Sequence, residues 1–174
     1  MSAPRTLAEV RPRGVILLTP MDRTGDDQLP PKPPLGLRHE RTVLVAQRHT
    51  VPAFYRNLIP LPELPSVLAT AWLVALVEGT CAEALRPYLS PGESSVGVAV
   101  AISHVAPTPA GLSVTARIVL TKIDGRRLTF SADCFDNVEY VGSALHERML
   151  IDVGRFDGRL RSKRSKHPSA ERSE

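Results

Sequence analysis

The sequence predicts an α+β fold in which one long central helix is wrapped by a curved antiparallel sheet. Two observations lead to this prediction. Residues 67–85 lack proline and are apolar nearly all round, as a buried helix is. The segments after them alternate apolar and polar residues between turn signals, which is the pattern of a strand meander. A long helix combined with such a meander is typical of an α+β domain.

The first strand and the helix are predicted from local composition. Arg41–Arg48 is rich in β-branched and apolar residues, which favours a strand. Prolines punctuate the loop that follows it. Ser66 can cap the helix at 67–85, because a serine side chain accepts hydrogen bonds from the free N–H groups of a first turn. The helix is expected to end before Pro87, which cannot continue it.

Four antiparallel strands are predicted after the helix, over 94–106, 112–120, 128–134 and 140–153. The first of them is apolar on both faces, and the face that carries Gly97 has unusually small side chains. The later strands show one apolar face each, as half-buried strands do. Asp124-Gly125 and Asp136-Asn137 are the turn signals that separate them.

The two ends of the chain have the composition of polar tails around one domain. Residues 1–36 hold seven of the sixteen prolines, so a disordered leader is predicted there. Met21 lies inside this leader, and translation could start there or at Met1. Residues 158–174 are polar and basic and predict a disordered tail. The folded domain is therefore expected over 37–157.

Composition excludes several classes of protein. The chain has 174 residues with 43% hydrophobic and 23% charged residues, which is ordinary for a soluble globular protein. No apolar run is long enough to cross a bilayer. Cys81 and Cys134 lack CxxC spacing, which fits reduced thiols in a cytoplasmic protein. A membrane span, a disulfide scaffold and a zinc-finger array are thereby excluded.

Glu78 is the first candidate for chemistry. It is the only charged residue between Glu63 and Glu83, in the middle of the apolar helix. Burying an unpaired carboxylate is costly, and perturbed carboxylates cluster at functional sites. The alternative is a glutamate at the edge of the helix that reaches solvent or a sheet arginine such as Arg148.

Thr70 and His104 are weaker candidates when each is taken alone. Thr70 lies roughly 12 Å along the helix from Glu78 and about 80° around it, so both can border one pocket without touching. A lone helical threonine commonly bonds back to its own helix. His104 could act as a general base near a helix carboxylate, or be a satisfied histidine at a strand end. Alternation places His104 and Gly97 on opposite faces unless a β-bulge lies between them.

No metal or cofactor motif accompanies these residues. The histidines do not have the spacing of metal ligands, and none is near either cysteine in sequence. GxSxG, P-loop and GxGxxG motifs are absent. His146 and Arg148 share a strand face, from which Arg148 could reach an anionic ligand or form a surface ion pair.

Taken together, these segments resemble the hotdog-fold thioesterases, and specifically the fluoroacetyl-CoA thioesterase group. The resemblance spans about residues 41–156. It is carried by several motifs: Leu76-Val77-Glu78-Gly79-Thr80-Cys81, Leu85-Arg86-Pro87-Tyr88-Leu89-Ser90-Pro91-Gly92-Glu93, Ser95-Val96-Gly97, Ser103-His104-Val105-Ala106-Pro107 and His146-Glu147-Arg148.

The resemblance implies a hotdog fold, a homodimer with the substrate near the subunit interface, and hydrolysis of a short-chain acyl-CoA without a further cofactor. It implies a catalytic set of Thr70, Glu78 and His104. Gly97 would line the acyl site through its backbone, and Arg148 would face the substrate. As a mechanism we expect Glu78, oriented by Thr70, to attack the carbonyl or position the attacking water while His104 acts as general base.

One departure from the group concerns the lid over the acyl group. Phenylalanines form this lid in the fluoroacetyl-CoA thioesterase group, and the matching positions here are Leu61 and Leu64. Leucines keep the lid apolar and change its shape. We therefore expect a broader or different short-chain acyl preference.

Two other functions stay open at the level of sequence. One is a hotdog protein that binds acyl-CoA or an acyl carrier without hydrolysis, or that resembles a dehydratase. The other is an interaction protein whose segment 159–166 binds nucleic acid or an anionic surface. The net charge of +4 resides entirely in residues 159–174, and no aromatic residue interleaves with those basic residues. A nucleic-acid partner is therefore not expected.

Overall fold

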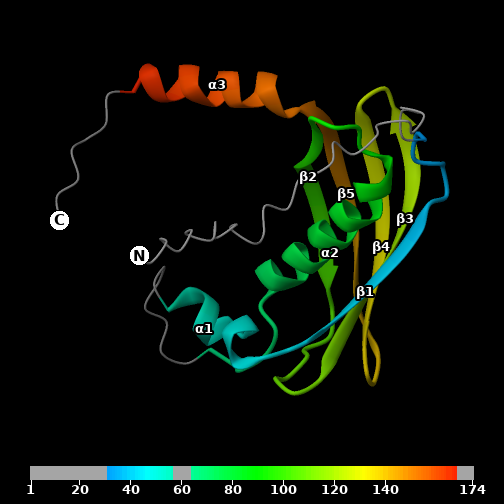
Figure 1. Ribbon diagram of the computed structural model, residues 1–174. Helices are drawn as coiled ribbons and strands as arrows, with labels where there is room; N and C mark the ends of the chain where they lie inside the picture. Colours follow the sequence, from blue (N-terminus) through cyan, green and yellow to red (C-terminus); the bar gives the residue numbers. More distant parts are fainter. Residues whose placement is uncertain (1–30, 57–63, 168–174) are drawn as a thin grey trace, which may run out of the picture.

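A five-stranded antiparallel sheet curves around one long helix in the computed structural model, which describes residues 31–56 and 64–167 (Figure 1). The strands are β1 (Arg38–Leu44), β2 (Glu93–His104), β3 (Ser113–Asp124), β4 (Arg127–Asp136) and β5 (Tyr140–Asp152). The helices are α1 (Val51–Tyr55), α2 (Thr70–Leu85) and α3 (Val153–Ser165), with short 3-10 helices η1 (Gln47–His49) and η2 (Arg86–Tyr88).

The order of the strands across the sheet is β1-β3-β4-β5-β2. Of the four strands predicted as a meander, β3, β4 and β5 form one. Strand β2 does not pair with β3 as the order in the chain would require, but with β5 at one edge, while β1 pairs with β3 at the other edge. Helix α2 lies across the concave face and contacts β1, β2, β3 and β5. The α+β architecture with a wrapped central helix, predicted from the sequence, is confirmed.

The core lies between α2 and the sheet. Leu73, Val77 and Cys81 of the helix are fully buried against Leu128 and Phe130 of β4. The predicted inner face of 128–134 is confirmed, because every second residue of β4 from Leu128 is buried. Fully burying side chains of this kind stabilises the fold by about 1.5–3 kcal/mol each.

The first strand and the helix begin and end at other residues than predicted. The strand covers Arg38–Leu44 instead of 41–48, because Gln47–His49 turn into η1. The helix starts at Thr70, and Ser66 does not cap it. Residues Val67 and Leu68 form isolated bridges with Pro109 and Thr50 instead. Their backbone groups are thereby satisfied outside the helix.

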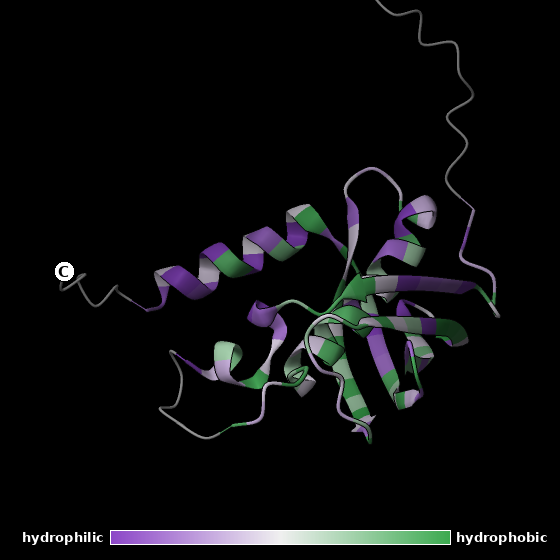
Figure 2. Cartoon of the chain, turned by 90° about the horizontal axis from the view of Figure 1, so that it is seen from below, coloured by the Kyte–Doolittle hydropathy of each residue, from purple (hydrophilic) through white to green (hydrophobic). Residues whose placement is uncertain are grey.

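The start of the predicted disordered tail is a helix, so the tail boundary at residue 158 is wrong. Asp152 caps α3, since its Oδ1 accepts a hydrogen bond from the Arg155 N–H at 2.7 Å. The helix continues through arginine, lysine and leucine, which favour helices. It buries none of its residues and extends away from the sheet (Figure 1). Figure 2 shows it as a mainly hydrophilic helix.

The N-terminal boundary also lies slightly before the predicted one. The Gly36 N–H donates to the Leu120 carbonyl at 2.8 Å, so residues before 37 already contact the sheet. Residues 1–30 of the predicted leader lie outside the described residues. Among the described residues, no helix is long and apolar enough to cross a membrane.

Candidate active site

Glu78 lies on the flank of α2 that faces β2 and β5. Its side chain is 46% exposed, and its Oε1 lies 3.4 Å from Nη1 of Arg148. Gly97 of β2 lies directly against it, because a Cβ at position 97 would come within 2.7 Å of Oε1. Both interpretations of Glu78 therefore hold at once: the carboxylate has an arginine partner and remains open to solvent.

A β-bulge in β2 brings Gly97 and His104 to the same face of the sheet. Gly97 pairs with Arg148 and Ala99 pairs with Glu147, so Val98 is the extra residue. Both Gly97 and His104 then face α2, where they meet Glu78 and Thr70. The bulge that simple alternation required is thus present.

His104 and Thr70 form a second pair at the start of α2. Thr70 Oγ1 lies 3.0 Å from Nδ1 of His104. Burial lowers the pKa of His104 below its ordinary value of 6.5, and a contact with the Ala106 backbone opposes this only in part. Nε2 is buried and finds no hydrogen-bond partner within residues 31–56 and 64–167. A neutral imidazole with a free ring nitrogen is suited to accept a proton.

The two pairs lie apart within one chain. Thr70 and Glu78 are separated by eight residues of α2, which is roughly 12 Å along the helix axis. In the part of the chain that the structure describes, no hydrogen bond or ion pair joins Glu78 to Thr70 or His104. The structure therefore brings together Thr70 with His104, and Glu78 with Gly97 and Arg148, but not one pair with the other.

Arg148, which the resemblance implies would face the substrate, is buried within the single chain. Its residue is only 3% exposed. Nε donates to Ser95 Oγ at 3.0 Å and Nη2 to the Ser95 carbonyl at 2.8 Å. Nη1 contacts the Glu78 carbonyl and Oε1, both at 3.4 Å, and His146 Nε2 at 3.2 Å. The guanidinium is thus fully engaged inside the protein, where it can orient Glu78.

Ser95 and His146 are part of this cluster, although sequence analysis did not name them as site residues. A signal for His146 was present, since it shares the strand face of Arg148. Its burial and its contact with the arginine depend on how α2 sits on the sheet. Of the two predicted lid residues, Leu64 is half-buried in the segment before α2, and Leu61 lies outside the described residues.

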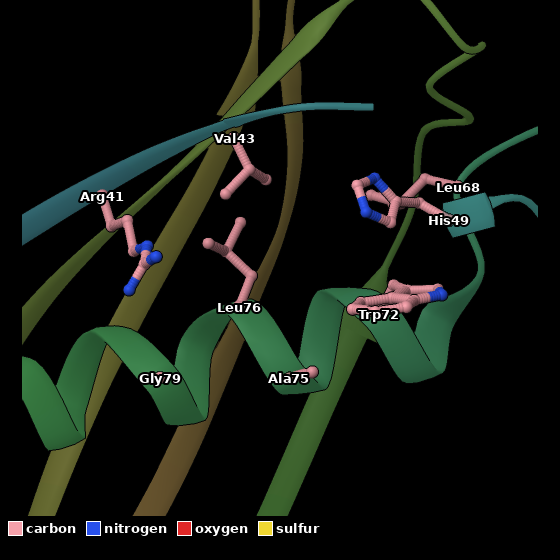
Figure 3. A pocket seen from close by; sticks show the side chains of 8 residues that line it. All are labelled: Arg41, Val43, His49, Leu68, Trp72, Ala75, Leu76 and Gly79. Carbon is pink, nitrogen blue, oxygen red and sulfur yellow. The ribbon is translucent and has the colours of Figure 1, made fainter. Parts of the chain in front are cut away.

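A separate apolar cavity of about 230 Å³ lies between α2 and β1 (Figure 3). Trp72 forms one wall; its ring lies 4.6 Å from that of His49 with the two planes tilted by 58°, and its Nε1 donates to the Arg48 carbonyl. This cavity is on the flank of α2 that faces β1, whereas Thr70 and Glu78 lie on the flank that faces β2. It is therefore not assigned to the candidate site.

The described residues contain no group of three or more histidine, cysteine, aspartate or glutamate side chains placed to hold a metal ion. Cys81 and Cys134 are buried free thiols. Burial raises the pKa of Cys81 to about 12 and that of Cys134 to about 11, which makes both poor nucleophiles. The candidate site itself presents a carboxylate, a hydroxyl and imidazole groups.

Comparison with known proteins shows the family and agrees with the fold. The sequence profile of the fluoroacetyl-CoA-specific thioesterase family matches residues 45–154, which is more than half of the chain. The chain belongs to the fluoroacetyl-CoA-specific thioesterase family. The matched region includes both pairs of candidate site residues and ends at the start of α3.

One relative in this family is the fluoroacetyl-CoA thioesterase of Streptantibioticus cattleyicolor. It is 38% identical over 129 residues, which cover 74% of this chain and 93% of the relative. A solved structure of the fluoroacetyl-CoA thioesterase FlK is 38% identical with a TM-score of 0.72, covering 75% of this chain and 96% of that one. A threonine-to-serine variant of FlK, 37% identical with a TM-score of 0.72, was solved in complex with acetyl-CoA and covers 75% and 98%.

A more distant structure shows the fold alone. A hotdog-like protein from Thermanaerovibrio acidaminovorans is 24% identical, with a TM-score of 0.68 and coverage of 75% of this chain and 92% of that chain. The hotdog fold expected from the resemblance is thereby confirmed.

Proposed function

We propose that this protein hydrolyses short-chain acyl-CoA thioesters to the free acid and CoA. Family membership supports the reaction class, and the named activity of the relatives supports the CoA thioester as substrate. The observation that carries the proposal is the placement of Glu78, whose half-exposed carboxylate lies between Arg148 and Gly97. A fixed carboxylate beside a glycine backbone is an arrangement suited to attack on a small carbonyl group.

The residues can perform the reaction without help from a metal or an organic cofactor. A thioester is activated, and its thiol leaving group has a pKa of about 8.5, so it departs readily. Glu78 would attack the carbonyl or orient the attacking water, with Arg148 holding the carboxylate in place. His104 would accept the proton, and the Thr70 hydroxyl would fix its ring. The Gly97 N–H would stabilise the oxyanion, a contribution of roughly 3 kcal/mol for one such donor.

A homodimer would unite the two pairs of residues. Strand β2 is an edge strand of 12 residues that, within residues 31–56 and 64–167, pairs only with β5, and its Val98 and Val100 are 45% and 43% exposed. Such an edge favours pairing with another strand. Two-fold pairing along β2 would place two α2 helices side by side in opposite directions. Thr70 and His104 of one protomer would then approach Glu78 of the other, with the acyl-CoA bound between them.

We further propose that the enzyme works in the cytoplasm and accepts a broader set of short acyl groups than fluoroacetyl alone. The buried free thiols are consistent with a reducing compartment. Leu64 gives the segment before α2 an apolar side chain, smaller than the phenylalanine expected from the resemblance. The complex of a FlK variant with acetyl-CoA supports a substrate with a small acyl group.

The test is thiol release from a panel of acyl-CoAs, acetyl to hexanoyl with fluoroacetyl added, by the wild type and the Glu78→Gln variant. The amide keeps the shape of the side chain and removes its charge, so we expect kcat to fall by at least about 100-fold, as when an important electrostatic group is removed. Near-normal turnover by the folded variant would refute the assignment of Glu78. No release by the wild type from any member would favour acyl-CoA or acyl-carrier binding without hydrolysis.

A further inference from the structure

Strand β5 carries a second buried histidine, His146, to which the proposed reaction assigns no part. It is 2% exposed, and its Nε2 lies 3.2 Å from Nη1 of Arg148. Its Nδ1 is also buried and has no hydrogen-bond partner in the described part of the chain. Buried polar atoms without partners are rare in proteins, so this ring requires an explanation.

The contact with Arg148 determines the protonation state of the ring. A guanidinium has only N–H donors, so Nε2 must accept, and the one proton of the neutral imidazole must sit on Nδ1. The backbone of Ala99 interacts with the ring, although its contact falls short of hydrogen-bond geometry at Nδ1. In a protonated ring, the Nε2 N–H would instead point at an N–H of Arg148, and the positive charges of the two side chains would lie next to each other.

The groups around His146 come from three elements. Arg148 on β5 and Glu78 on α2 are the charged groups that act on it. Strand β2 faces it with the Ala99 backbone and with Gly97, where a Cβ would lie 3.2 Å from Cε1 of the ring. Burial first and the charge of Arg148 second lower the pKa of His146 below 6.5, against an opposing effect of Glu78. The neutral ring is thus the form present at neutral pH.

We propose that His146 is a positioning residue: its neutral Nε2 accepts a hydrogen bond from Arg148 and so fixes the guanidinium that orients the Glu78 carboxylate. The inference rests on the proposed catalytic role of Glu78. Nη1 is the atom that the two contacts share, at 3.2 Å from His146 and 3.4 Å from Glu78 Oε1. Ser95 holds the other side of the guanidinium at Nε and Nη2. His146 is therefore the side-chain acceptor that holds Nη1 from within β5.

The experiment compares His146→Gln, which retains an uncharged acceptor, with His146→Leu, which has none. His39→Gln serves as a control at a half-exposed histidine on β1, outside the Arg148 cluster. At pH 8 we expect the leucine variant to lose about 10- to 100-fold in kcat on the best acyl-CoA, since a buried hydrogen bond to a charged group is lost. KM should change little, because the lost hydrogen bond acts on the orientation of the Glu78 carboxylate through Arg148. The glutamine variant should stay within about threefold of the wild type.

The pH profile distinguishes a positioning role of His146 from a role in packing alone. Two histidines, His104 and His146, must both be neutral for activity in the wild type, so log kcat/KM should fall with a slope of about two on the acid side. In the glutamine variant the second titration is absent, and the slope should fall to about one. An unchanged slope, equal losses in both variants, or wild-type kcat in the leucine variant would each overturn the proposal.

A measurement independent of turnover is the tautomer of His146 in the full-length protein, read from the ring nitrogen shifts by NMR. The proposal requires a proton on Nδ1, a free lone pair on Nε2 and a shift of the signals in Arg148→Lys. A ring protonated on Nε2 would refute it. If the wild type releases no thiol, the proposed function fails, while the NMR result still decides whether His146 accepts from Arg148.

Discussion

The absence of a side chain at position 97 determines where the Glu78 carboxylate can lie. The Cβ of any other residue would approach Oε1 to 2.7 Å and the His146 ring to 3.2 Å. Because Glu78 is half exposed, its side chain can swing away from such a Cβ. The conflict would therefore be resolved by moving the catalytic carboxylate and not by unfolding the protein.

Gly97→Ala should accordingly reduce kcat by about 100-fold, the effect of displacing a reacting group by roughly 1 Å. Gly79→Ala is the matched control, since a Cβ there meets nothing within 4 Å. That variant should keep its activity and gain up to about 1 kcal/mol in the free energy of unfolding, because alanine favours a helix. Steady-state kinetics and urea unfolding are to be measured for both variants. Equal kcat values for Gly97→Ala and Gly79→Ala would contradict the role of Gly97.

At the scale of single residues, the sequence singled out Glu78 and missed Ser95 and His146, which contact Arg148. The isolation of Glu78 in an apolar helix singled it out, and Arg148 was the partner considered for it. The burial of Arg148 was not predicted, because a lone arginine on a strand normally reaches solvent. Ser95 and His146 enter the site only through cross-strand pairing and the packing of α2, which residue types do not reveal.

At the scale of the elements, the edge strand β2 has two tasks. It positions Gly97 and His104 toward α2 on one side, and it leaves a row of backbone groups free on the other. Short, charged or covered edges are the usual protection against strand pairing. The apolar and small residues of β2 provide little such protection, which agrees with a strand that meets a second copy.

Val98→Lys should therefore shift the proposed dimer toward monomer. The residue occupies the bulge near the middle of β2, so two-fold pairing would bring two lysines close together. Val138→Lys places the same charge in the exposed turn between β4 and β5 and should leave the dimer intact. Analytical ultracentrifugation checks both variants, and a Val98→Lys dimer as tight as the wild type would argue against this interface.

Alternation predicted the meander well because β3, β4 and β5 each bury one face. It misplaced the start of α2, since Val67 and Leu68 are apolar in either conformation and tertiary bridges decide between them. Sequence analysis missed α3 because a polar segment rich in basic residues has the composition of a disordered region. The cap at Asp152 was a usable sequence signal for that helix.

At the scale of the whole molecule, the proposed homodimer would unite the two pairs of candidate site residues, so activity would depend on dimer formation. One chain supplies Thr70 with His104 at the start of α2 and Glu78 two turns later. The sequence predicted the distance of roughly 12 Å between Thr70 and Glu78. It did not predict that His104 contacts Thr70 while Arg148 contacts Glu78, because those contacts depend on how β2 and β5 run along α2. The prediction at this scale concerns mixed dimers.

Mixing two inactive proteins, His104→Ala and Glu78→Gln, should restore about a quarter of wild-type activity. Random exchange makes half of the dimers mixed, and each mixed dimer has one intact site and one doubly altered site. If each chain held a complete site, every site in the mixture would carry one defect. Activity after unfolding and refolding the mixture, against each protein refolded alone, distinguishes the two cases, and no recovery would place the site within one chain.

The bulge at Val98 shifts the alternation of inward- and outward-facing side chains along β2 by one residue. Residues before it and residues after it follow opposite rules for which side chain points inward, and only this offset allows a glycine and a histidine seven positions apart to share a face. A strand of the same length that paired with β5 without this bulge would turn the histidine to the opposite face, although no residue type had changed. Deleting Val98 would instead remove the bulge and leave the glycine and the histidine an even number of positions apart, on one face, so the orientation of the histidine depends on the bulge and the spacing together.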